Sequence, residues 1–182
     1  MKDGYFTFYI YWSYSEKILK KDLSEIFHIS KDQIVNLAQA KNHKITYEMR
    51  QFRCNSQNSH NSIFCNEINL FVNGEVVIDS RCFNNLLLAN HISLAVKKEV
   101  LIFNESDNPY LWLLIDQNNL YLVSEIEDNN DCILIDKQNA KKLFFEKALT
   151  LLPGIDYYTD SRPAKAYYVN DYNLWSTCIR EI

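Results

Sequence analysis

The sequence predicts an α+β protein in which a mostly antiparallel sheet, built from hairpins, carries an N-terminal helical hairpin and a later helix. Two hairpin signals support this prediction. Asn73-Gly74 stands between two strand-like segments, and Asn-Gly is a preferred sequence for the turn of a two-residue β-hairpin. Gln117–Asn119 separates two further strand-like segments. Because hairpins outnumber strand–helix–strand units along the chain, an antiparallel sheet with helices packed on it is the expected architecture.

The N-terminal part predicts one strand followed by two helices. Tyr5–Trp12 is aromatic and β-branched, as strands buried on at least one face are. Ser15 then begins a pattern in which apolar residues recur at helical spacing. Ser30–Gln33 has the form of a capping box, so a second helix should begin there and end near Asn42.

The middle of the chain predicts further strands. In Lys44–Phe52 the polar residues Thr46, Glu48 and Arg50 alternate with apolar ones, which is typical of a half-buried strand. The other elements expected in this part are the strands Ile63–Val72, Glu75–Asp79, Val100–Phe103, Tyr110–Asp116 and Leu120–Glu127, and a partly helical segment, Phe83–Val96.

The C-terminal part predicts one more strand and the later helix. Cys132–Ile135 reads as a short strand, and Asp136 should cap a helix over Lys137–Leu152. The tyrosine-rich tail beyond it is expected to add a strand near Ala166–Val169 and a short helix from Asp171.

Composition limits the class of protein. A chain of 182 residues with 47% hydrophobic residues fits one globular domain, residues 1–182, and three glycines and three prolines leave little material for a linker. The five cysteines have irregular spacing, which is not the pattern of a disulfide framework. Apolar runs fall far short of the ~20 residues that a membrane span needs. We therefore expect a cytoplasmic protein that has no membrane segment.

Metal and cofactor sites are not expected. Cys54, His60 and Cys65 lie close together in sequence, but their gaps do not match the tight ligand pairs of structural zinc sites, and a solvated loop explains them better. The three glycines stand far apart, so no phosphate-binding loop or dinucleotide fingerprint can form. No cofactor is therefore predicted.

Catalytic residues cannot be assigned from the sequence, and we expect no enzyme. The histidines are scattered, and nothing marks a pocket around them. An alternative is an enzyme whose site is assembled in three dimensions, for example from Cys82 or His91 with carboxylates. Arg81 could lower the pKa of its neighbour Cys82, although a small buried cysteine is the commoner situation.

The distribution of charge is uneven. No lysine or arginine occurs between Lys98 and Lys137, and the segment Glu99–Asp136 contains nine acidic residues, whereas the rest of the chain has a formal charge of +5. Unpaired acidic clusters attract basic partners, although lysines from elsewhere could neutralise these in the fold. The expected partner contacts are the acids and two apolar anchors of this segment: Asp116, Glu125, Glu127, Asp128, Asp131, Asp136, Trp112 and Tyr121.

Aromatic residues are a second signal for binding. Seven of the ten residues from Tyr5 to Tyr14 are aromatic. Such residues are frequent at protein interfaces and equally in cores, so a structural or regulatory subunit that oligomerises through aromatic surfaces is a further alternative. Nucleic-acid binding is disfavoured, because the net charge is −4 and no basic stripe accompanies the aromatic residues.

In modest size, acidity, aromatic content and lack of an enzyme motif, the chain resembles the bacterial immunity proteins that neutralise a cognate toxin, including those of contact-dependent growth-inhibition systems. The resemblance implies a toxin partner, often a nuclease whose positive cleft suits an acidic inhibitor. The expected function is thus an intracellular inhibitor that binds a basic protein through an acidic surface. The oligomeric state is not indicated.

Overall fold

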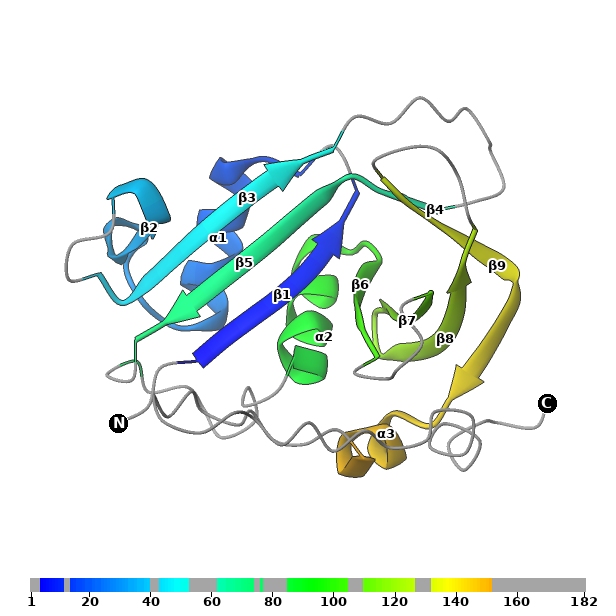
Figure 1. Cartoon of the computed structure of the whole chain (residues 1–182). Helices are drawn as coiled ribbons and strands as arrows, with labels where there is room; N and C mark the ends of the chain where they lie inside the picture. Colours follow the sequence, from blue (N-terminus) through cyan, green and yellow to red (C-terminus); the bar gives the residue numbers. More distant parts are fainter. Residues whose placement is uncertain are drawn as a thin grey trace, which may run out of the picture.

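The computed structural model describes residues 4–11, 14–39, 43–52, 62–73, 76, 85–104, 110–126 and 132–151. Strands dominate this part of the chain and helices pack on them, which confirms the α+β class (Figure 1). In chain order the elements are β1 (Gly4–Ile10), α1 (Glu16–Ile26), η1 (Lys31–Gln33), β2 (Ile34–Asn36), η2 (Leu37–Gln39), β3 (Ile45–Gln51), β4 (Ser62–Phe64), β5 (Asn66–Val72), α2 (Asn85–Val96), β6 (Val100–Phe103), β7 (Leu111–Asp116), β8 (Asn119–Glu125), β9 (Ile133–Leu143) and α3 (Phe145–Leu151).

The described strands form one sheet in the order β2-β3-β5-β1-β6-β7-β8-β9-β4. Every pair in it is antiparallel except β2 with β3. The mostly antiparallel sheet expected from the hairpin signals is therefore confirmed.

The sheet curls because one stretch of chain contributes to two distant places in it. β4 pairs with β9 at the end of the strand order, and only Cys65 separates β4 from β5, which pairs with β1 and β3. The end of the sheet formed by β9 and β4 therefore curls back toward β5 in its middle. In Figure 1, β4 and β9 cross near the end of β5.

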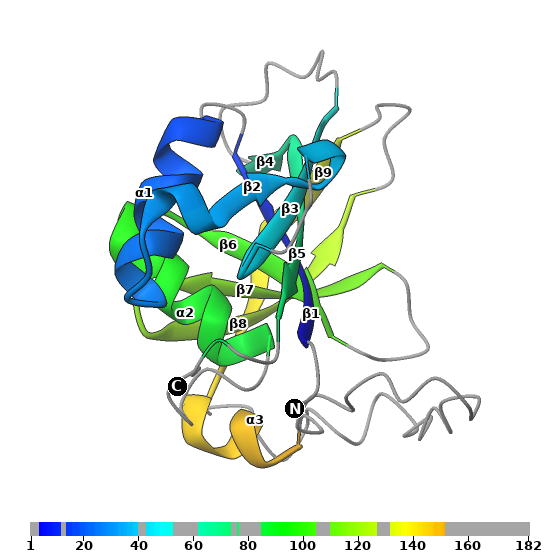
Figure 2. The same cartoon turned by 90° about the vertical axis from the view of Figure 1, so that its left-hand side faces the viewer.

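Two cores lie on the two faces of this sheet. The larger one fills the space between the sheet and the helices, with α1 and α2 on the same face (Figure 2). The smaller one lies on the other face, within the curl; its buried members are Tyr9, Phe64, Leu101, Trp112, Leu114, Val123 and Ile135.

The first predicted helix is confirmed and the second is wrong. Ser15 caps α1, its hydroxyl oxygen accepting a hydrogen bond from the backbone N–H of Ile18 at 3.4 Å. Ser30 makes no such cap, since its hydroxyl bonds to the Asp32 carboxylate, and only a 3-10 turn follows. Ile34–Asn36 then pairs with β3 as a parallel strand, because this pairing buries Ile34 and covers part of an open sheet edge.

The predicted hairpin at residues 110–127 is confirmed as β7 and β8, and α2 holds its turn. Gln117 and Asn118 both adopt left-handed backbone conformations, with φ of 44° and 75°, as a type I′ turn requires. The Asn90 amide exchanges hydrogen bonds with the backbone N–H and the side-chain oxygen of Asn118, at 3.1 and 2.9 Å. The Ser93 hydroxyl accepts from the Gln117 N–H at 3.0 Å. The helix therefore fixes where this hairpin ends.

The later helix is much shorter than predicted. Asp136 does not cap a helix; it lies within β9, opposite Ser124 of β8, and accepts from the Gln138 N–H at 2.8 Å. β9 continues to Leu143 because β8 gains a hydrogen-bonding partner along its length. A register shift between Leu122 and Ser124 of β8 accommodates the local turn that Asp136 forms with Gln138 and Asn139. Only Phe145–Leu151 is helical, and most of Glu75–Asp79 and residues 152–182 lie outside the described part.

Cysteine chemistry differs from the expectation at one position. Cys132 is disulfide-bonded, although the sequence pattern predicted no disulfide framework. Cys65 is buried, and this burial raises the pKa of its thiol. Among the described residues, no helix is both long enough and apolar enough to span a membrane.

A buried carboxylate anchors the start of α1. The Tyr14 hydroxyl donates a hydrogen bond of 2.8 Å to Asp22, which is only 3% exposed. Burial raises the pKa of Asp22, and it raises that of Tyr14 as well. Asp22 thus binds its proton more tightly in the folded chain than in the unfolded chain.

We predict that Asp22→Asn becomes more stabilising, relative to wild type, as pH rises. Below the unfolded pKa of about 3.9 the aspartic acid is protonated in both states. As pH rises through the higher folded pKa, the wild type loses stability, by about 1.4 kcal/mol for each unit of pKa difference, while asparagine keeps an acceptor for Tyr14 and does not titrate. Urea unfolding at about pH 3 and about pH 7 measures this difference, with Glu146→Gln, at an exposed position of α3, as the control. An equal effect at both pH values would contradict it.

We also predict that thiol titration of the unfolded chain finds two fewer reactive thiols without reductant than with it, because Cys132 is in a disulfide. Disulfides are rare in reducing compartments, so the same measurement on protein alkylated inside its native cell tests the expected cytoplasmic location. Full reactivity without reductant would show that the bond does not form.

Candidate functional site

The face of β1, β5 and β3 that points away from the helices carries the most organised group of polar and aromatic side chains in the described structure. We call it the open face. The registers place its residues in three rows across the strands: Tyr5–Phe71–Thr46, Thr7–Asn69–Glu48 and Tyr9–Glu67–Arg50. The intervening residues, such as Phe6, Ile68 and Tyr47, point into the helix-side core. Strand alternation therefore brings nine side chains onto one surface.

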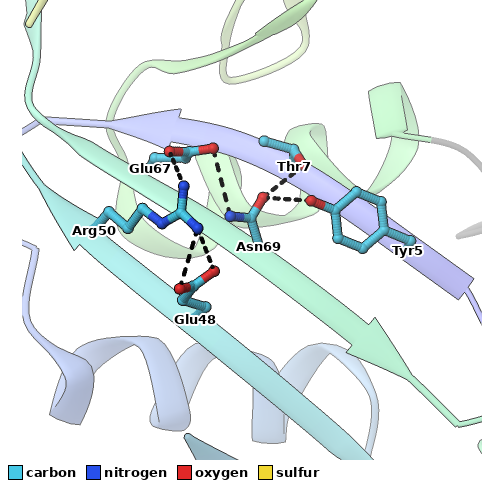
Figure 3. Close-up of polar contacts among 6 residues, drawn as sticks. All are labelled: Tyr5, Thr7, Glu48, Arg50, Glu67 and Asn69. Carbon is cyan, nitrogen blue, oxygen red and sulfur yellow. Dashed lines mark hydrogen bonds and ion pairs between the residues drawn. The ribbon is translucent and has the colours of Figure 1, made fainter. Parts of the chain in front are cut away.

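Asn69 is the centre of a hydrogen-bond network on the open face (Figure 3). Its side-chain oxygen accepts from the hydroxyls of Tyr5 and Thr7, at 2.9 and 2.8 Å. Its amide nitrogen donates to Glu67 at 3.4 Å. The amide is only 4% exposed, so each of these bonds replaces one that water would otherwise supply. These hydrogen bonds hold the side chains of Tyr5, Thr7 and Glu67 around Asn69.

Arg50 links β3 to β5. Its guanidinium donates to both oxygens of Glu48, at 3.3 and 3.1 Å, and lies 4.0 Å from Glu67 (Figure 3). The side chains of Arg50 and Glu48 are well exposed, whereas that of Glu67 is 17% exposed. Exposed pairs of this kind contribute little stability, so their main effect is to set the position of the charges.

Aromatic rings flank the polar network at both ends. Tyr5 packs on Phe71 with ring centroids 4.9 Å apart, yet the two residues remain 44% and 37% exposed. Toward β6, Phe103 is 46% exposed and packs on Trp112 at 4.4 Å. Large exposed aromatic side chains beside fixed polar groups are typical of binding surfaces.

Tyr9 connects the open face to the curl of the sheet. Its ring packs edge-on against Phe103 and Trp112, at 5.6 and 5.2 Å, and the Trp112 indole donates to Glu125 at 2.9 Å. Burial raises the pKa of Tyr9, and the carboxylates of Glu67 and Glu125 add to the rise. Tyr9 therefore stays neutral, and the carboxylates of Glu67 and Glu125 both lie close enough to influence its hydroxyl group.

The open face is acidic. Among its described residues and the adjoining Glu125, three carboxylates stand against one guanidinium: Glu48, Glu67, Glu125 and Arg50. The chain as a whole has a formal charge of −4. A surface of this composition favours a positively charged partner.

The contact residues expected from the acidic segment divide into separate groups. Asp116 lies at the β7–β8 turn, opposite Asn119, whereas Glu125 lies at the far end of β8. Six residues of strand separate 119 from 125, or about 20 Å. Asp136 lies opposite Ser124, near Glu125. The expected contacts Glu127, Asp128 and Asp131 lie outside the described residues.

The two expected apolar anchors have different positions. Trp112 is 4% exposed and belongs to the core within the curl. Tyr121 is half-buried, with the ammonium of Lys142 5.9 Å from its ring centroid. Asp136 carries local hydrogen bonds from Asn139 and Gln138, which lower the pKa of its carboxyl group.

The structure offers no metal centre within its described residues, where no three His, Cys, Asp or Glu side chains come together. Cys54, His60 and Cys82 lie outside these residues, so their expected roles are not decided. His91 is half-buried on α2. The hydroxyls of Tyr5 and Thr7 on the open face both donate to the Asn69 side-chain oxygen.

Sequence reasoning missed most of the open face. The alternation in β3 did place Glu48 and Arg50 on the polar side of a strand. Glu67, Asn69 and Phe71 follow the same period in β5, and this was the available signal. What the pattern could not show is that β1 and β3 both flank β5 and bring the three sets together.

Comparisons of the chain with protein-family models, with curated proteins and with solved structures find no match.

We predict that Asn69→Ala lowers the free energy of unfolding by about 2 kcal/mol, because it removes both the acceptor and the donor at the centre of the network. Thr7→Val removes one donor and keeps the shape, so it should cost less, since Tyr5 still bonds to Asn69. Urea unfolding of both variants measures the comparison. Equal losses would show that Asn69 does not organise the face.

Proposed function

We propose that this chain is a protein-binding inhibitor that captures a basic protein on the open face. The observation that carries the proposal is the combination, on one sheet surface, of exposed aromatic rings, a fixed polar network and an excess of carboxylates. A second feature supports it: α1 and α2 lie on the opposite face and leave this one accessible (Figure 2).

The network favours binding because it reduces the cost of association. Immobilising a flexible side chain at an interface costs about 0.5–1.5 kcal/mol. Tyr5, Glu67 and Asn69 are already held by mutual hydrogen bonds in the unbound chain. Tyr5, Phe71 and Phe103 then supply apolar area that a partner can bury, at positions that do not need to be reorganised.

The partner's chemistry follows from charge. Glu48, Glu67 and Glu125 attract lysine and arginine, while Arg50 limits the register in which a basic surface can approach. The resemblance of the chain to bacterial immunity proteins makes a toxin domain, for example a nuclease with a positive cleft, the partner that we propose. This role needs no catalytic group on the chain.

The proposal moves the binding surface from the hairpin turn to the open face. Glu125 belongs to both sets and Asp136 lies close to it. Asp116 lies about 20 Å away along the hairpin. Trp112 contributes by holding Phe103 and Glu125 in place, because it is buried itself.

The test is co-expression with each product of the neighbouring genes, followed by size-exclusion chromatography and titration calorimetry. We predict a stable complex with a basic product whose toxicity the chain suppresses. Phe71→Ser and Phe103→Ser should each weaken it by roughly 30-fold or more, the effect of removing a hot-spot anchor of about 2 kcal/mol. Rising salt should weaken it further, because it screens exposed charges.

Matched variants separate a specific surface from a general effect. Leu94→Ser alters a residue of similar exposure, 39%, on α2, and should leave binding unchanged. Glu48→Lys should weaken binding, whereas Glu25→Lys on α1 should not. Failure to bind any neighbouring product, or equal losses in Leu94→Ser and Phe71→Ser, would refute the proposal. A self-associated chain that Phe71→Ser makes monomeric would show that a second copy occupies the face.

A further inference from the structure

A second site lies at one open end of the curled sheet, beside Tyr11. It is a pocket of about 340 Å³. The described residues around it come from just after β1, from β4, from the connection between α2 and β6, from the end of β7 and from β9: Tyr11, Ile63, Phe64, Lys97, Lys98, Glu99, Asp116 and Lys137. Its volume lies at the lower end of the range for small-molecule sites, and the mouths of curled and closed sheets are common places for them.

The pocket gathers the lysines that border the acidic segment. Lys97 and Lys98 precede that segment and Lys137 follows it, so Lys137 is far from the other two in sequence and lines the same pocket in the fold. Lys137 forms an ion pair with Glu99. The base of the acidic segment is thus a local basic site on a chain whose net charge is negative.

The backbone at Lys98 is fixed by one buried serine. The Lys98 N–H donates to the Ser93 carbonyl at 3.3 Å, and the Ser93 hydroxyl donates to the Lys98 carbonyl at 2.6 Å. Lys97 has a left-handed φ of 55°, which lysine adopts at a cost and which glycine usually provides at the end of a helix.

The side chains around the lysines form an apolar wall. The Lys98 ammonium lies 5.4 Å from the ring centroid of Tyr11, which keeps it beside the pocket. Ile63, which is half-buried, and Phe64, which is buried, also line the pocket. An organic group can pack against Tyr11 and Ile63 while an anionic group meets the ammonium groups.

The balance of charge favours an anion. Among the described residues that line the pocket, three carry ammonium groups and two carry carboxylates. The pair between Lys137 and Glu99 cancels one of each sign, which leaves Lys97 and Lys98 against Asp116. No arginine is present in the described lining. Arginine offers the planar fork that suits carboxylates, whereas lysine binds phosphate as a point charge.

We propose that this pocket binds a small phosphorylated organic molecule. Lys97 and Lys98 hold the phosphate, Tyr11 and Ile63 contact the organic part, and Asp116 accepts a hydrogen bond from a hydroxyl or amino group of the ligand. The helix dipole of α2 offers an ordinary reason for two lysines near its C-terminus, but it does not account for Lys137 or for the hollow between them. The proposal is independent of the open face.

The test is a titration of the full chain with inorganic pyrophosphate at constant ionic strength, followed by amide NMR and calorimetry. Saturable binding should shift the amide signals of Lys97, Lys98 and Glu99. Lys97→Gln and Lys98→Gln should each weaken binding by roughly tenfold, the effect of losing one charge-assisted contact. Asp116→Asn should strengthen it, because a repelling carboxylate is removed. Lys141→Gln, an exposed lysine of β9 outside the pocket, is the matched control.

Three results would overturn the proposal. The first is no saturable binding of pyrophosphate up to about 10 mM, which is weaker than any specific small-molecule site needs. The second is an equal loss in Lys141→Gln and Lys98→Gln, which would show attraction to net charge alone. The third is binding of citrate as tight as that of pyrophosphate, which would assign the pocket to carboxylates. Preference for pyrophosphate with a loss confined to Lys97→Gln and Lys98→Gln supports it.

Discussion

The exchange of partners along residues 62–72 is the constraint on which the rest of the structure depends. At Ser62–Phe64 this stretch pairs with β9, and from Asn66 onward it pairs with β1 and β3. A strand cannot belong to the end and to the middle of a flat sheet, so the sheet must curl. The aromatic core of Tyr9, Phe64 and Trp112 fills the resulting concave side, and its burial stabilises the curl in turn.

The same curl separates two surfaces of opposite character. At β3, β5 and β1 the side of the sheet away from the helices presents aromatic and acidic groups. At one end of the curled part, the strand termini converge around a basic pocket. Tyr9 of β1 belongs to the open face, and Tyr11, just beyond the end of β1, lines the basic pocket. One topological feature thus accounts for both proposed sites.

Local sequence was sufficient for elements whose own pattern is strong. β1, α1, β3 and the β7–β8 hairpin all follow from alternation, helical spacing, a serine cap or a turn. It failed at Ile34–Asn36 and at Lys137–Leu143, which have helical character locally and are strands in the fold. In both places an exposed sheet edge, β3 or β8, gains hydrogen bonds from the segment, and this long-range gain exceeds a weak local preference.

For function, the sequence by itself determined composition: an acidic chain, a segment without lysine or arginine, and a strand with Glu48 and Arg50 on its polar side. Only the tertiary structure decided which of these residues meet. It placed Asp116 far from Glu125, brought Glu67 beside Arg50, and joined Lys98 and Lys137 at one pocket. The physical reason is that strand pairing sets distances between residues by register and neighbour, and a linear pattern contains neither.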